Sequence, residues 1–186
     1  LGIAMLGKIN QGTGHIVHDS MPKIELANSV SANINDIAIA LRNMMLSADP
    51  ADQRKQTDAI LAARQAAAGN LGKLASMLDS DRERALLAKM NDANTRYAQG
   101  QEVLLELIRS GTPDDSSAYL YGQLRPVLLV YKQLIAEQIS LQNTLATTAG
   151  DKANATYANT RTLLIGMSLA ALAIAAALAY GITRSI

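Results

Sequence analysis

The sequence lacks cysteine, tryptophan and phenylalanine, so that six tyrosines are its only large aromatic side chains. Without cysteine, disulfide bonds and thiol chemistry are excluded. The aromatic residues that fill the cores of many sheets and compact enzymes are nearly missing, and small apolar residues must provide the packing. Alanine, leucine, glutamine and arginine are plentiful, and these side chains lose little rotamer freedom in a helix. The composition therefore favours an all-helical protein.

The chain also has little net charge and only two histidines. The 17 lysines and arginines nearly cancel the 16 acidic residues, which argues against a nucleic-acid or polyanionic partner. Two histidines without cysteine make a metal site or an activated nucleophile hard to assemble, and the G-x-S-x-G and H-E-x-x-H motifs are missing. We therefore expect no enzymatic activity, no cofactor and no metal, and any recognition should be local.

An uncharged apolar run near the end of the chain predicts a transmembrane helix. The run LLIGMSLAALAIAAALAYGI, residues 163–182, has the length of about 20 residues that a hydrocarbon core of about 30 Å requires. Arg161 and Arg184 flank it, where long cationic side chains reach the membrane interfaces. Residues 1–7 resemble the end of another span, with a free amphipathic start as the alternative. We therefore expect a sensory region at 8–160, a second span at 161–184 and a cytoplasmic linker starting at 185–186.

Helix start signals divide the region between the two spans. Prolines occur only at positions 22, 50, 113 and 126, so long uninterrupted helices are allowed. Asp49-Pro50, Ser80 with Glu83, and Thr112-Pro113 each place a capping oxygen at a helix start. These signals predict helices over residues 3–47, 50–78, 81–110 and 113–160, the last continuing to 184. Pro126 predicts a bend in the fourth helix.

Apolar residues recur in these helices at the spacing of a narrow heptad stripe, and the turns between the helices are short. Such stripes are typical of an antiparallel up-down-up-down four-helix bundle, here with a long first and fourth helix that continue into the transmembrane segments. The predicted stripes are Val30, Ile34, Ile37, Leu41 and Met44; Ile60, Ala67, Leu71, Leu74 and Leu78; Leu86, Met90, Ala93, Tyr97, Leu104 and Leu107; and Leu120, Leu124, Val127, Tyr131, Leu134, Leu141 and Leu145.

Short motifs accompany this architecture: ALRNMML at 40–46, GTP at 111–113, and LRPV at 124–127 followed by Tyr131. Together they resemble the four-helix-bundle ligand-binding domains of bacterial methyl-accepting chemotaxis proteins, the class that includes the aspartate and serine receptors. The resemblance implies a homodimer in the inner membrane with its bundle in the periplasm. It also implies a HAMP linker after the second span and partners in a chemotaxis kinase and its adaptor.

In the aspartate receptor, arginines of the first helix bind the ligand carboxylates. The resemblance implies that role for Arg42, the one residue of this chain that corresponds to them. An aspartate-type site is therefore doubtful, and charge must come from other helices. Residue counts from the turns place five further side chains within a few turns of one another. A buried guanidinium needs an anionic partner, which a small di- or tricarboxylate such as malate or citrate would supply. The other five candidates are Arg64, Arg96, Tyr97, Arg125 and Tyr131.

Less specific interpretations stay open for these residues. Each arginine has a solvent-facing alternative, with Arg96 paired to Asp92 or Glu102, and the tyrosines are equally consistent with simple core positions. An aromatic-acid or amino-acid receptor is an alternative ligand class. A sensor histidine kinase input domain and a membrane-anchored structural bundle without a ligand are the alternative functions.

Overall fold

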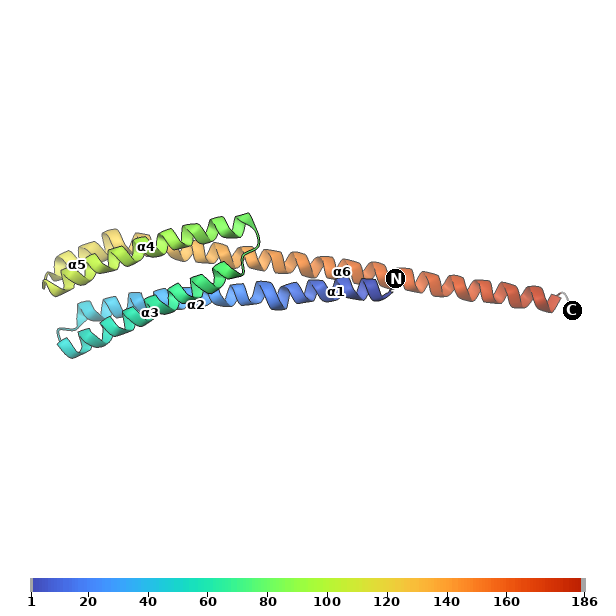
Figure 1. The fold of residues 1–186 in the computed structure, drawn as a ribbon, viewed down its shortest axis with the longest axis horizontal. Helices are drawn as coiled ribbons and strands as arrows, with labels where there is room; N and C mark the ends of the chain where they lie inside the picture. The colour runs from blue at the N-terminus through green and yellow to red at the C-terminus, as the bar shows by residue number, and fades with distance from the viewer. Residues whose placement is uncertain (1, 185–186) are drawn as a thin grey trace. The chain divides into compact units, whose positions relative to one another are not determined.

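The computed structural model describes the backbone of residues 2–184 and the side chains of residues 7, 9–180 and 184. Every described element is a helix, which confirms the all-α four-helix fold class. Leu1 and the predicted linker start at 185–186 lie outside the described residues. The elements in Figure 1 are α1 (Gly2–His15), η1 (Ile16–Ser20), α2 (Met21–Leu46), α3 (Pro50–Ser76), α4 (Asp81–Arg109), α5 (Pro113–Tyr119), η2 (Leu120–Leu124) and α6 (Arg125–Arg184).

Helices α3 and α4 begin where the capping signals predict. The Asp49 side chain accepts a hydrogen bond from the backbone N–H of Ala51 at 3.0 Å. Ser80 and Glu83 form a reciprocal capping box, in which each side chain binds the backbone of the other. Local chemistry alone therefore fixes the starts of both middle helices.

The turn before α5 differs from the prediction. Helix α5 begins at Pro113, but Thr112 makes no side-chain cap, so the expected capping role of its oxygen is wrong. The Thr112 hydroxyl instead donates to the backbone carbonyl of Leu107 at 3.3 Å. Gly111 has a φ of 71° and reverses the chain there, which carries the Thr112 hydroxyl back over the end of α4.

Two π-helical segments interrupt the helices that the sequence predicts as continuous. η1 ends two residues before Pro22, and η2 ends two residues before Pro126. In the second case the Arg125 N–H reaches back to the carbonyl of Leu120, five residues earlier. Proline has no N–H, and a wider turn ahead of it accommodates the missing hydrogen bond.

The chain divides into two compact units, and the larger, Asp19–Thr144, contains the bundle. Within it α2, α3, α4 and the first part of α6 run side by side (Figure 1). We call the end where the chain enters at Asp19 and leaves at Thr144 the exit end; the turn between α3 and α4 lies there. The turns at 47–49 and 110–112 form the opposite, far end.

The core confirms the predicted stripes of α2 and α3 and corrects those of α4 and α6. Every predicted stripe residue of α2, and Ile60, Ala67, Leu71 and Leu74 of α3, are buried. In α4 the buried residue is Leu87 in place of Leu86, and Leu107 is only half-buried. In α6 the predicted residues Val127, Leu134, Leu141 and Leu145 are half-buried, while the buried positions within the bundle are Tyr131, Ile135, Gln138 and Gln142. In η2, Leu124 is buried as predicted and Leu120 is half-buried. Both stripes keep the seven-residue repeat, but the second buried position of each repeat lies mostly on the opposite flank of the positions Met90, Tyr97 and Tyr131, which were predicted correctly.

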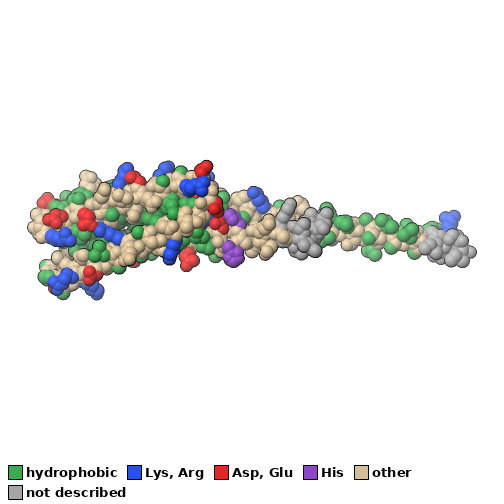
Figure 2. All heavy atoms as spheres, in the orientation of Figure 1, with side chains coloured by type: hydrophobic (Ala, Val, Ile, Leu, Met, Phe, Trp, Pro, Cys, Tyr) green, Lys and Arg blue, Asp and Glu red, His purple; other side chains and the backbone are tan. Residues whose placement is uncertain are grey.

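The second unit, Leu1–His18 with Leu145–Ile186, joins α1 to the remainder of α6. A methyl group on Gly12 would lie 3.1 Å from Cβ of Ala153, so glycine allows the two helices to approach closely. Among the described residues one helix is long and apolar enough to cross a membrane, with a mean hydropathy of 2.3 over 18 residues, none of them buried. In this helix the apolar window lies in the C-terminal part of α6, where hydrophobic side chains lie on the surface (Figure 2).

Candidate functional site

The six residues predicted from the sequence fall into two groups in the bundle. Tyr97 and Tyr131 are buried and Arg64 is half-buried, while the other three arginines are exposed. The exposed group is Arg42, Arg96 and Arg125. The bundle interior therefore brings together only Arg64 and the two tyrosines.

The tyrosines of α4 and α6 pack against each other in the middle of the core. The ring centroids of Tyr97 and Tyr131 are 6.5 Å apart, with the ring planes inclined at 60°. Burial raises the pKa of both phenols, and the positive charge of Arg64 only partly offsets this at Tyr97. Both therefore keep their protons and remain hydrogen-bond donors. The Tyr131 hydroxyl has no hydrogen-bond partner within the described residues.

Arg64 of α3 connects this layer to α4. Its Nε donates to Gln101 Oε1 at 2.6 Å, and its Nη1 forms an ion pair with Glu102. The remaining guanidinium nitrogen, Nη2, is buried and makes no hydrogen bond in the described part of the chain. Arg64 is therefore largely committed to protein partners, with one donor left over.

Arg96 lies at the edge of a groove between α4 and α6. Its Nε is 3.0 Å from Asp92 Oδ2, and its side chain is 68% exposed. Arg96 therefore points outward and pairs with Asp92, which is one of the two surface pairings that the sequence left open. The groove has a volume of about 400 Å³. Two cations and one acid give it a net charge of +1 (2 − 1). The residues lining this α4–α6 groove are Lys89, Asp92, Ala93, Arg96, Pro126, Val127, Val130 and Leu134.

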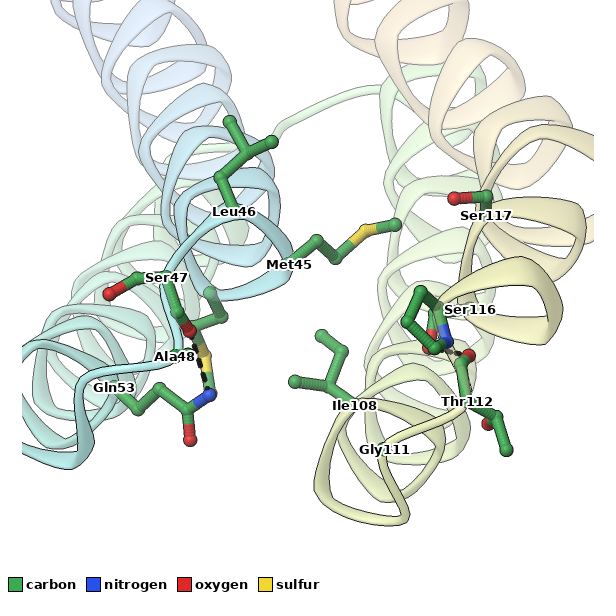
Figure 3. Close-up of a pocket in the computed structure, with 12 residues that line it drawn as sticks. Met45, Leu46, Ser47, Ala48, Gln53, Ile108, Gly111, Thr112, Ser116 and Ser117 are labelled. Carbon is green, nitrogen blue, oxygen red and sulfur yellow. Dashed lines mark hydrogen bonds between the residues drawn. The ribbon is translucent and has the colours of Figure 1, made fainter.

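A second pocket, of about 360 Å³, lies at the far end of the bundle. In Figure 3 Met45 extends from the end of α2 toward Ser117, across the space above Ile108. Its lining contains hydroxyls, thioethers and aliphatic side chains but no charged residue. This far-end pocket therefore offers nothing to neutralise a carboxylate, and Arg42 does not line it.

A buried charged cluster at the exit end was not predicted. Lys23 Nζ lies 2.8 Å from Asp19 Oδ1 and 3.1 Å from Glu83 Oε1, and the Lys23 and Glu83 side chains are 1% and 3% exposed. Gln142 of α6 donates to the same Glu83 oxygen at 2.7 Å. Ser80 donates to Glu83 Oε2 through both its hydroxyl, at 2.8 Å, and its backbone N–H, at 2.9 Å. We call Asp19, Lys23, Ser80, Glu83 and Gln142 the exit-end cluster.

The two buried charges of the cluster, Lys23 and Glu83, are held in the ionised form. Burial alone would raise the pKa of Glu83, but the hydrogen bonds from Gln142, Ser80 and Lys23 outweigh it and lower that pKa to about 2. Burial likewise pulls the pKa of Lys23 down, but Asp19 and Glu83 reverse the direction and raise it. The cluster is thus a buried ion pair with hydrogen bonds on both sides.

The sequence did contain a signal for this cluster. Lys23 lies seven residues before Val30, in phase with the buried stripe of α2, and Glu83 lies in phase with Leu87 and Met90. Polar residues in a seam mark a site that needs partners. Within the described part of the chain, this cluster included, no group of three or more His, Asp or Glu side chains is arranged to hold a metal ion.

One comparison with known proteins, against family models, agrees with this architecture. A family model described as "Four helix bundle sensory module for signal transduction" matches residues 1–157. A solved structure, "Periplasmic sensor domain of sensor histidine kinase", is similar at 18% sequence identity and a TM-score of 0.47, over 75% of this chain and 88% of that chain. Among curated proteins no match was found.

Proposed function

Since the chain belongs to the family of four-helix-bundle sensory modules for signal transduction, we propose that it is the sensory part of a chemoreceptor that detects a small organic acid. The resemblance to chemotaxis receptors supports a homodimer in the bacterial inner membrane with the bundle in the periplasm. Helix α6 runs without a break from the bundle through the predicted span, and it is the element that would carry a displacement across the membrane. Known interface shifts of helices measure about 1–2 Å.

The observation that carries the ligand proposal is the α4–α6 groove. It combines a guanidinium and an ammonium group with a single carboxylate, on otherwise apolar walls. Arginine binds carboxylates through two parallel hydrogen bonds, and Arg96 is exposed enough to exchange its partner Asp92 for a ligand. Pockets with apolar walls and a few convergent polar groups are the usual form of small-molecule sites.

The composition of the groove narrows the class of acid. Its net charge of +1 matches one carboxylate, and the five apolar residues of its lining match a ring or a short hydrocarbon body. A second or third carboxylate needs a further cation, and Arg125, which precedes Pro126 in the chain, is the nearest in sequence. We therefore favour an aromatic or aliphatic monocarboxylate such as benzoate, ahead of malate or citrate.

The output of the receptor is a second part of the proposal. Control of chemotaxis is proposed here from the short motifs at 40–46, 111–113 and 124–127. The alternative is a sensor histidine kinase, in which the same kind of sensory bundle would act on a kinase of the same polypeptide. Co-purification from cells separates the two outputs. A chemotaxis kinase and its adaptor should co-purify with a chemoreceptor but not with a sensor histidine kinase.

A thermal-shift panel on the chain in detergent tests the ligand proposal. Benzoate, succinate, malate, citrate and amino acids are added singly, and an acid that binds the folded state raises the melting temperature. Arg96→Ala should abolish the shift. The control is Arg109→Ala, which also removes an exposed, ion-paired arginine of α4, but from outside the groove. No shift with any acid, or a shift that survives Arg96→Ala unchanged, contradicts the proposal.

A further inference from the structure

The exit-end cluster converges on one carboxylate from three sides of the bundle. Glu83 Oε1 accepts from Lys23 of α2 and Gln142 of α6. Oε2 accepts from the hydroxyl and the backbone N–H of Ser80, just before α4, and more weakly from the backbone N–H of Asp79 at 3.3 Å. An ionised carboxylate offers about four acceptor positions, and these donors fill them. The hydrogen-bond acceptor positions of the Glu83 carboxylate are therefore all occupied, and the hydrogen bond from Gln142 is the one that α6 donates.

The place of Gln142 along α6 gives this bond its importance. Gln142 precedes by two residues the point, Thr144, at which the bundle unit ends and the other unit continues along the same helix. It is thus the last fully buried residue of α6 within the bundle. A movement of α6 relative to α2 and α4 acts directly on the Gln142–Glu83 bond.

The buried positions of α6 near this point are polar. Gln138, one turn earlier on the buried face of α6, has neither amide atom hydrogen-bonded within the described residues. Gln142 Oε1 and Ser20 Oγ likewise make no hydrogen bond there. Where a buried seam consists of amides instead of interlocking aliphatic groups, directional hydrogen bonds set the position of a helix. The position of α6 at the exit end therefore depends mainly on Glu83.

We propose that Glu83 is a latch for α6. Lys23, Asp19 and Ser80 fix the carboxylate to α2 and to the start of α4, and Gln142 is the movable part that engages it. The inference rests on the proposed function in one respect, since it takes α6 as the helix that transmits the signal. A displacement of 1–2 Å exceeds the range over which an N–H···O bond keeps good geometry, so signalling requires release of the latch.

The absence of cysteine in the chain allows a clean test with introduced spin labels. Ala85 on α4 and Ser140 on α6 are exposed and line the same surface groove, so labels at Ala85→Cys and Ser140→Cys report the position of α6 against α4. Double electron–electron resonance is measured on the full chain in detergent without ligand. Gln142→Met, which removes the hydrogen bond but keeps the side-chain length, should shift or broaden the distance distribution by about 2 Å or more.

A matched control exists on the same helix. Gln133 also donates to a glutamate, Glu137 at 3.2 Å, but this pair is exposed, so Gln133→Met should leave the distribution unchanged. If Gln142→Met fails to fold, Gln142→Asn keeps an amide that is too short for Glu83 and should broaden the distribution in the same way. A distribution like that of the control in the folded variant overturns the latch. Because no ligand is added, this outcome is independent of the thermal-shift panel.

Discussion

Replacing Lys23 by methionine removes the cation that faces Glu83 and leaves the carboxylate buried. The cost can be worked out in two ways. The lowering of the Glu83 pKa from 4.5 to about 2 corresponds to about 3 kcal/mol, at 1.36 kcal/mol per pKa unit; Gln142 and Ser80 share in it with Lys23, so this is an upper bound on the part due to Lys23. Removal of one partner from a buried ion pair costs about 3–5 kcal/mol in other proteins. Since Glu83 keeps its bonds from Ser80 and Gln142, the lower figure applies.

Thermal unfolding of the chain in detergent, followed by circular dichroism at pH 7, measures this loss. For a chain of this size each 1 kcal/mol shifts the melting temperature by about 2–4 °C, so Lys23→Met should lower it by about 6–12 °C. Lys73→Met, on the exposed face of α3, is the control and should change it little. A loss below about 2 °C for Lys23→Met, less than 1 kcal/mol on the same scale, would refute the reasoning.

The dependence of the stability of Lys23→Met on pH is a second, independent test of the role of Glu83. The folded pKa of Glu83 lies below its unfolded value of 4.5, so its contribution is complete above pH 4.5 and is lost as the pH falls toward 2. Asp19 and Asp79 are the other acids that face Lys23. Lys23→Met lacks the part of this contribution that Lys23 supplies, so its deficit in stability relative to the unsubstituted chain should narrow between pH 7 and pH 3. A deficit of constant size contradicts the assignment to Glu83.

Three further predictions concern single side chains, each followed by thermal unfolding. Gly72→Ala places a methyl group on an exposed part of α3 where nothing lies within 4 Å, and should stabilise the bundle by about 0.5–1 kcal/mol; a lower melting temperature would contradict this. Ser80→Ala removes the cap of α4 and a donor to Glu83, and should cost about 1–2 kcal/mol, whereas Ser76→Ala on the exposed end of α3 should cost less. Tyr131→Phe removes a buried hydroxyl without a partner in the described chain and should leave the stability unchanged or higher; a large loss would indicate that an ordered water binds it.

Helix starts could be predicted because their causes are local. Asp49, Ser80 and Pro113 each act within the first turn that follows them, so sequence neighbours contain all the information. Which face of α4 and of α6 is buried was harder to predict. Met90, Tyr97 and Tyr131 were predicted correctly, but the sequence has apolar residues on both flanks of these positions, and the packing of distant helices buries Leu87 and Ile135 in place of Leu86 and Leu134.

The candidate site shows the same limit. The pairing of Arg96 with Asp92 is a contact between residues four apart on one helix, and it was one of the alternatives open from the sequence. The α4–α6 groove depends on how two distant helices pack, which no local pattern gives. Lys23 and Glu83 are separated by sixty positions, and the sequence supports an N-terminal capping role for the glutamate so well that its second, long-range role was hidden.

The π-helical segment η2 has a consequence for insertions and deletions. A π turn holds one residue more than the α turn in its place, so it is equivalent to a single-residue insertion stored ahead of Pro126. Removal of one residue from 120–124 would convert it to a regular α turn and leave the buried face of α6 in phase. The same deletion after Tyr131 would rotate everything beyond it by about 100°, which would turn Gln138 and Gln142 out of the core. The bundle should therefore tolerate the loss of one residue from 120–124, just before Pro126, but not from the part of α6 between Tyr131 and Gln142.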